Sequence, residues 1–140
     1  MGATMIARLE FRVDGFPQTK GSWKVAGRKR NGAPRMLPDN PAETSWAESV
    51  AWAAKAALRG HHSTGDDRRY AVALDFTLVP PPNRGKTNRR DLDKLARSVL
   101  DALTGIVWHD DEQVDRLELS KSVTGPGRPK PGVAIVIVAL

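Results

Sequence analysis

Four aspartates in this sequence occur as two close pairs beside strongly basic segments. Asp91 and Asp93 follow two arginines in the stretch RRDLDKLARSVLDAL, and Asp110 and Asp111 are adjacent in the stretch WHDDEQV. Mg²⁺ prefers oxygen ligands and is usually held by one or two carboxylates together with waters and substrate phosphates. The two pairs therefore indicate metal-assisted chemistry at a phosphodiester, in which the ion polarises the bond and activates water.

Each aspartate also has an ordinary structural explanation. A helix is predicted from about Leu92 to Leu103, so Asp91 suits its N-cap and Asp93 its first turn. Asp93 and Arg97 have the i,i+4 spacing of a surface ion pair, and the Asp-Asp-Glu run could be a solvated turn. The metal-site interpretation therefore depends on whether the strand after Asp111 lies beside the start of this helix, where three or four carboxylates can converge.

The charge of the chain indicates what kind of substrate it meets. It has 140 residues, 22 Lys and Arg against 16 Asp and Glu, a net charge of +6 and an isoelectric point of about 10.1. Much of the positive charge lies in two clusters, between Lys20 and Arg35 and between Arg84 and Arg97. Such clusters are typical of surfaces that bind the phosphate backbone of a polyanion. The residues predicted to bind DNA are Lys20, Lys24, Arg28, Lys29, Arg30, Arg84, Lys86, Arg89, Arg90 and Lys94.

Length and composition exclude several other classes of protein. The chain has no cysteine, which excludes disulfides and thiolate metal sites. Its first residues lack the apolar core of a signal peptide, and no apolar run is long enough to cross a bilayer. We therefore expect one domain, spanning residues 1–140, in a cytoplasmic protein.

Hydrophobic periodicity predicts an interleaved set of strands and helices. Period-two alternation and one continuous apolar run predict strands over residues 5–13, 70–79, 114–122 and 133–139. The last of these should be a central strand covered on both faces, because its apolar run is nearly unbroken. A basic, turn-rich stretch at 21–38 predicts a hairpin or a long loop.

Two helices complete the predicted fold. The first begins at an N-cap on Asn40, ends near Gly60, and carries Trp46 and Trp52 as core or dimer contacts. The second, over about 92–103, has a regular apolar stripe. Strands that interleave with helices indicate an α/β or α+β fold, with one mixed sheet and two main helices in a single compact domain.

The combination of RDLDKL, LDAL and DDEQV, within about residues 88–121, closely resembles the RusA family of Holliday junction resolvases. The resemblance implies a RusA-like fold and a homodimeric, bacterial or phage-type endonuclease for DNA recombination and repair. It implies Mg²⁺ as cofactor, with Mn²⁺ as a substitute. It places the metal-binding, catalytic carboxylates at Asp91, Asp93 and Asp111. It also places Arg97 where the family has a supporting lysine, and Lys94 where the family usually has asparagine.

Two other functions remain open at this point. The chain could be a metal nuclease that acts on flaps or other branched DNA. It could instead bind branched DNA and cut it weakly or not at all, since Lys94 and Arg97 depart from the family pattern. A cleavage assay on several branched substrates separates these alternatives.

Overall fold

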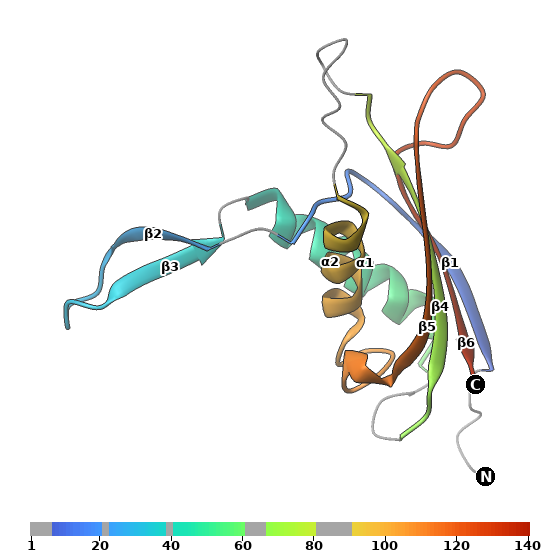
Figure 1. Ribbon diagram of the computed structural model, residues 1–140, viewed down its shortest axis with the longest axis horizontal. Coiled ribbons are helices and arrows are strands. Elements are labelled where there is room, and N and C mark those ends of the chain that lie inside the picture. Colours follow the sequence, from blue (N-terminus) through green and yellow to red (C-terminus); the bar gives the residue numbers. More distant parts are fainter. Residues whose placement is uncertain (1–6, 21–22, 39–40, 61–66, 81–90) are drawn as a thin grey trace.

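The computed structural model describes residues 7–20, 23–38, 41–60, 67–80 and 91–140 (Figure 1). Within these ranges the two strands of a separate hairpin and residue 41 are described by their backbone alone. Among the helices in the described ranges, none is long and apolar enough to cross a membrane.

The centre of the molecule is a four-stranded mixed sheet. Its order is β1 (Arg8–Asp14), β6 (Gly132–Ala139), β4 (Tyr70–Leu78) and β5 (Val114–Val123). β6 pairs antiparallel with both β1 and β4, whereas β4 and β5 run parallel. The expected mixed sheet with two helices is confirmed.

Both helices pack on one face of this sheet (Figure 1). α1 (Pro41–Leu58) buries Trp46, which is 3% exposed, together with Val50 one turn later. α2 (Leu92–Leu103) is sharply amphipathic and buries Leu95 and Val99 along one stripe. The core therefore lies between the helices and the facing side of β4 and β6. Trp52 was predicted to be either a core residue or a dimer contact. It is 71% exposed, so it is not part of the core.

The strand predicted over residues 133–139 is central in the sheet, as expected, but it is not covered on both faces. β6 is a central strand, and its core-facing residues Val133, Ile135 and Ile137 are buried. The alternate residues, including Ala134 and Val136, are only half-buried. No described helix packs on that side, so the unbroken apolar run does not mean burial on both faces.

The connection from β4 to β5 fixes the direction of α2. Parallel strands cannot be joined by a tight turn, and their crossover is usually a helix that returns along the sheet. α2 is the helix between these strands, so it runs opposite to both. Its first residues lie at the end of the sheet where β4 and β5 finish, and its last residues lie where they begin (Figure 1).

A hairpin outside the main sheet carries part of the predicted basic surface. β2 (Trp23–Arg28) pairs antiparallel with β3 (Pro34–Pro38) and projects away from the helices (Figure 1). Of the two alternatives predicted for 21–38, a hairpin or a long loop, the structure forms the hairpin. Its turn is closed by the N–H of Lys29, which donates to the carbonyl of Ala33 at 2.8 Å. The expected N-cap residue of α1, Asn40, lies outside the described residues.

Gly132, the first residue of β6, provides a test of this packing. Its φ is +156°, and a Cβ there would lie 2.2 Å from the carbonyl oxygen of Val13 on β1. We expect Gly132→Ala to lower the free energy of unfolding by about 1–3 kcal/mol or more, the cost of a strained backbone plus the displaced strand. Urea unfolding measures it. Gly125→Ala is the matched control, because a Cβ there meets nothing within 4 Å. Equal stability of the two variants would contradict this packing.

Candidate active site

The first turn of α2 exposes two carboxylates. Asp91 occupies the N-cap with extended backbone angles, and its carbonyl accepts a hydrogen bond from Leu95 N–H at 3.0 Å. Its side chain makes no capping hydrogen bond. Asp93 is exposed in the first turn. The predicted N-cap position is therefore confirmed, but the carboxylate of Asp91 is not used to hold the helix.

A lysine lies beside the first of these carboxylates. The Lys94 ammonium is 3.6 Å from Oδ2 of Asp91, and both side chains are more than half exposed. Exposed pairs of this kind contribute about 0–1 kcal/mol, so the contact is easily exchanged for another partner. Lys94 was predicted to bind DNA, and the structure places it against an acid.

Arg97 lies one helical turn after Asp93 and is exposed on the same helix. Among the side chains that the structure describes, Asp93 and Arg97 do not approach within the 4.0 Å of an ion pair. The surface ion pair that their spacing allowed is therefore not formed. The side chain of Arg97 is exposed on α2, so its guanidinium can bind an anion from outside the chain.

The second pair of aspartates sits in a rigid loop before β5. The 3₁₀ helix η1 (Asp111–Gln113) begins at an N-cap on Asp110, whose carboxylate accepts from Glu112 N–H at 2.9 Å. Gln113 is 2% exposed, and its side chain carbonyl accepts from the backbone N–H groups of His109 and Asp110. Its amide donates to Arg68 O at 2.8 Å. The carboxylate of Asp110 therefore caps η1. The neighbouring carboxylate, that of Asp111, extends from a loop that these hydrogen bonds hold in place.

Trp108 anchors the other side of the same loop. It is fully buried, its Nε1 donates to Thr104 Oγ1 at 3.1 Å, and its ring centroid lies 5.7 Å from that of Tyr70. The indole thus ties the end of α2 to the start of β4. Neither Trp108 nor Gln113 was predicted as a site residue, although Gln113 belongs to the DDEQV motif.

Arg69 neutralises the remaining acids near the loop. Its guanidinium donates to Asp115 and to Glu112, including bonds of 3.0 Å and 3.1 Å. The Arg69 hydrogen bond lowers the pKa of the Asp115 carboxyl. These partners are 43 and 46 residues away in the chain, so no local pattern could have identified the arginine.

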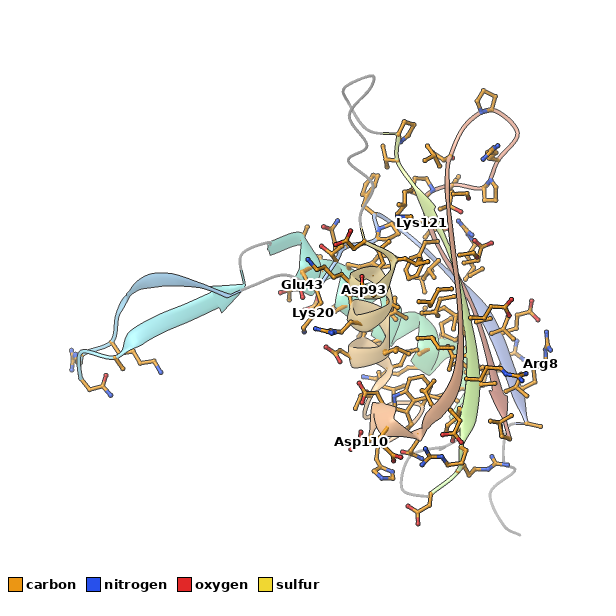
Figure 2. The ribbon with its side chains drawn as sticks, viewed as in Figure 1. Arg8, Lys20, Glu43, Asp93, Asp110 and Lys121 are labelled. Atoms are coloured by element: carbon orange, nitrogen blue, oxygen red, sulfur yellow. The ribbon has the colours of Figure 1, made fainter. Side chains whose placement is uncertain are left out.

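Lys20 joins the segment after β1 to both helices. Its N–H donates to Lys94 O on α2 at 3.1 Å, and its ammonium is 3.3 Å from Asp101 and 3.8 Å from the largely buried Glu43 of α1 (Figure 2). Lys20 was predicted to bind DNA, and the structure places it in a structural cluster. Asp101 was not predicted, although it continues the i,i+4 series of Asp93 and Arg97.

Asp111 is held where its charge is unfavourable. Partial loss of hydration raises the pKa of its carboxyl, and the negative charges of Asp110 and Asp101 raise it further. Among the described side chains, no cation lowers the pKa of Asp111 in return. A carboxylate that folding does not stabilise, on a backbone that folding does fix, is typical of a functional rather than a structural group.

The two acidic pairs do not converge within one chain. Asp111 lies near Asp101, in the last turn of α2, whereas Asp93 lies in the first turn, about 12 Å away at about 1.5 Å per residue. In the part of the chain that the structure describes, no three His, Asp or Glu side chains are grouped closely enough to hold one metal ion. The strand after Asp111 starts beside the end of α2 (Figure 2), not beside its beginning as convergence required.

The donor chemistry nevertheless suits Mg²⁺. Each end of α2 presents carboxylate oxygens to solvent, and Mg²⁺ typically takes one or two carboxylates, with waters and substrate phosphate completing its shell. Asp91 and Asp93 could supply such a pair at one end. At the other end of α2, Asp111 could supply a single carboxylate, because the carboxylate of Asp110 already caps η1.

Apart from Lys20 and Lys94, the basic residues predicted to bind DNA fall into three groups. Lys29 and Arg30 are exposed at the turn of the β2–β3 hairpin. Lys24 and Arg28 belong to β2, where only the backbone is described. Arg84, Lys86, Arg89 and Arg90 lie outside the described residues. The structure therefore places the first group on a projecting, solvent-exposed turn.

Comparison with known proteins gives one finding for nearly the whole chain. The family model described as endodeoxyribonuclease RusA matches residues 8–137 of the 140. The match runs from the first residue of β1 into β6, so it includes both helices and all four strands of the sheet. No curated protein matches the chain.

The charge environment of Asp111 predicts an unusual effect on stability. A raised pKa means that the folded protein loses stability as the pH rises from 3.8, the ordinary value, through the raised value. Asp111→Asn removes the disfavoured charge, so we expect it to be more stable than the wild type at neutral pH by about a few tenths of a kcal/mol. The gain should vanish below pH 3.8. Urea unfolding at both pH values measures it.

Asp115→Asn is the control of opposite sign. The pKa of Asp115 is lowered by Arg69, so its charge stabilises the fold above the ordinary pKa, and this stability is lost as the pH falls. We expect Asp115→Asn to be less stable than the wild type at neutral pH. A destabilised Asp111→Asn would show that the Asp111 carboxylate has a stabilising partner after all.

Proposed function

This chain belongs to the RusA family of endodeoxyribonucleases, and from that premise we propose that it resolves four-way DNA junctions by Mg²⁺-dependent hydrolysis. The observation that carries the proposal is the family match over residues 8–137, combined with exposed aspartates at the matching motif. The product would be a pair of nicks in the junction, made during recombination or repair of DNA inside the cell.

We assign the metal-binding role to Asp91, Asp93 and Asp111. Three observations support the assignment. All three side chains are exposed, the Asp91 side chain makes no capping hydrogen bond, and no described cation lowers the pKa of Asp111. A bound Mg²⁺, or Mn²⁺ in its place, would polarise the scissile phosphodiester and lower the pKa of an attacking water. The chain's own contribution is to hold carboxylates at fixed backbone positions. Arg97 would offset negative charge beside them.

The basic surface supplies affinity for the substrate. Lys29 and Arg30 at the hairpin turn, together with Lys24, Arg28 and the basic segment before α2, would contact backbone phosphates rather than bases. Contacts of this kind release counterions and make binding depend steeply on salt. They give no sequence preference, which suits a nuclease that selects DNA by its branched shape.

A homodimer fits both the substrate and the geometry of α2. A four-way junction has approximate two-fold symmetry and needs two incisions, so a symmetric dimer brings one site to each strand. Asp93 and Asp111 lie at opposite ends of α2, so a second copy would allow each site to draw carboxylates from both chains. The exposed ring of Trp52 is an apolar contact of the kind that a dimer would bury.

One observation favours the alternative of a protein that binds junctions but cuts them weakly. Lys94 replaces the asparagine that the resemblance leads us to expect, and its ammonium lies 3.6 Å from Asp91. A cation in contact with a proposed metal ligand competes with the metal for that carboxylate. The contact is exposed and weak, so we expect a lower affinity for Mg²⁺ rather than a loss of activity.

The deciding experiment is a cleavage assay on matched substrates. We expect the wild-type protein with Mg²⁺ to cut a four-way junction and to leave linear duplex and single strands intact. Preferred cutting of a flap would favour a different branched-DNA nuclease. Tight junction binding without cutting in Mg²⁺ or Mn²⁺ would favour the binding protein and reject the proposal.

The aspartates give the matched variants. We expect Asp91→Asn, Asp93→Asn and Asp111→Asn each to slow junction cleavage by about a hundredfold or more, because a charged metal ligand is worth several kcal/mol in the transition state. Junction binding should be unchanged or tighter, since a carboxylate that repels phosphate is removed. Asp110→Asn is the control. Asparagine also caps helices, so this variant should keep most of the activity.

Lys94→Asn tests the competition at Asp91. We expect its cleavage rate to reach half its maximum at a Mg²⁺ concentration lower than that of the wild type by up to about fivefold, the scale of an exposed ion pair. The rate is measured against Mg²⁺ concentration at constant ionic strength. Lys130→Gln removes the same charge elsewhere and should leave this concentration unchanged. An unchanged or raised Mg²⁺ requirement in Lys94→Asn would mean that the lysine does not compete with the ion.

A further inference from the structure

A pocket opens at the end of the sheet where β4 and β5 finish. Its volume is about 310 Å³, and its described lining residues are Leu78, Lys121, Ser122, Val123 and Arg128. Small-ligand sites occupy about 300–1,000 Å³, so this pocket has room for one small group such as a nucleotide unit. Among the described lining residues, none is a proposed catalytic residue and none is a predicted DNA-binding residue.

The register of the sheet determines which side the pocket faces. Phe76 pairs with Lys121 and Leu78 with Val123, and paired residues of neighbouring strands point to the same face. Phe76 and Leu78 are buried toward the helices. Lys121 and Val123 therefore project on the side of the sheet that carries α2, not toward the open face.

The chemistry of the lining is that of an anion site with an apolar floor. Lys121 is half-buried, so it enters the pocket from the strand rather than from a free loop. Arg128 reaches it from the β5–β6 loop, where its Nη1 donates to Val123 O at 3.2 Å. Leu78 and Val123 supply apolar surface to the same pocket. No acidic side chain is among the described lining residues.

The loop that carries Arg128 is fixed by its own hydrogen bonds. Thr124 N–H donates to Leu78 O at 2.8 Å, which ties the end of β5 to the end of β4. Thr124 Oγ1 donates to Pro129 O at 2.6 Å, and Arg128 N–H donates to Gly125 O at 3.0 Å. The second cation is therefore held by the backbone of a closed loop, which reduces the entropy lost on binding.

The position of the pocket connects it to the proposed active site. Ligands in open sheets with parallel strands bind at the carboxyl ends of those strands. β4 and β5 end here, and α2, which runs opposite to both, begins at the same end with Asp91 and Asp93 (Figures 1 and 2). A DNA strand whose phosphodiester lies at the start of α2 would pass this pocket with a neighbouring nucleotide.

We infer that this pocket binds one nucleotide unit of the DNA strand beside the scissile phosphodiester. Lys121 and Arg128 contact its phosphate, and Leu78 and Val123 contact its sugar or base. The inference deepens the proposed function, since it names a strand-positioning subsite of the same nuclease. It adds no chemical step, so the two cations are binding residues and not catalytic ones.

The test uses the full-length protein and a defined probe. Isotope-labelled wild type is titrated with a 5′-phosphorylated dinucleotide, and separately with inorganic phosphate, while backbone amide signals are followed by NMR. We expect the largest shifts at Leu78, at 121–123 and at Arg128, and tighter binding of the dinucleotide than of phosphate. Shifts spread over the hairpin instead, or equal affinity for phosphate, would overturn the inference.

Charge-matched variants separate the pocket from general attraction. We expect Lys121→Gln and Arg128→Gln each to weaken dinucleotide binding about tenfold, because a hydrogen bond to a charged group is lost. Lys130→Gln and Arg116→Gln remove the same charge outside the pocket and should have little effect. Arg128→Lys should retain part of the affinity, which guards against a loop that has merely loosened. Equal losses in the control variants would overturn the inference.

The outcome is independent of the cleavage result. If the wild type fails to cut junctions but the dinucleotide shifts the pocket residues, the proposed function fails and the nucleotide site stands. If the wild type cuts junctions but the pocket residues do not respond, only the nucleotide site is rejected.

Discussion

The parallel pairing of β4 and β5 determines most of what this molecule can do. A parallel pair requires a crossover, and α2 is that crossover, so its direction is fixed by the sheet. Asp91 and Asp93 are thereby placed at the carboxyl ends of the two strands, with the pocket around Lys121 at the same end. The Asp111 loop is placed at the other end, where β5 begins. An antiparallel pairing joined by a hairpin would have no helix to separate the acids.

The acids of this region divide into those that bind an arginine or a backbone N–H and one, Asp111, whose charge the fold disfavours. Asp110 caps η1, and Glu112 and Asp115 are bound by Arg69. Asp111 has a raised pKa, and the residues just before it are held by the side chain of Gln113, which accepts from the backbone N–H groups of His109 and Asp110. Neighbouring residues of one type thus have opposite energetic roles. An unfavourable charge of this kind is common in functional sites, which fits the metal-binding role proposed for Asp111.

The cations of the described residues also differ in their surroundings. Lys20 forms ion pairs with Asp101 and Glu43 and so links three segments of the chain. Lys94 forms an ion pair with Asp91. Lys29 and Arg30 project into solvent on a hairpin, and Lys121 and Arg128 line a pocket. The net charge of +6 alone does not distinguish these roles. A basic excess predicts attraction to a polyanion, whereas the partners of each side chain decide which cations are available to it.

The sequence by itself determined the mixed α+β fold, the basic hairpin, the amphipathic α2 with Asp91 at its start, and the family motif. These are consequences of residues close together in the chain, since caps, periodicity and turns are set within a few positions. Only the tertiary structure decided which groups meet. The Arg69 cluster joins residues 43 and 46 positions apart, and the pocket depends on the register of Leu78 with Val123. Strand order and register arise from burying one shared core, so no local pattern could place the two acidic pairs at opposite ends of α2.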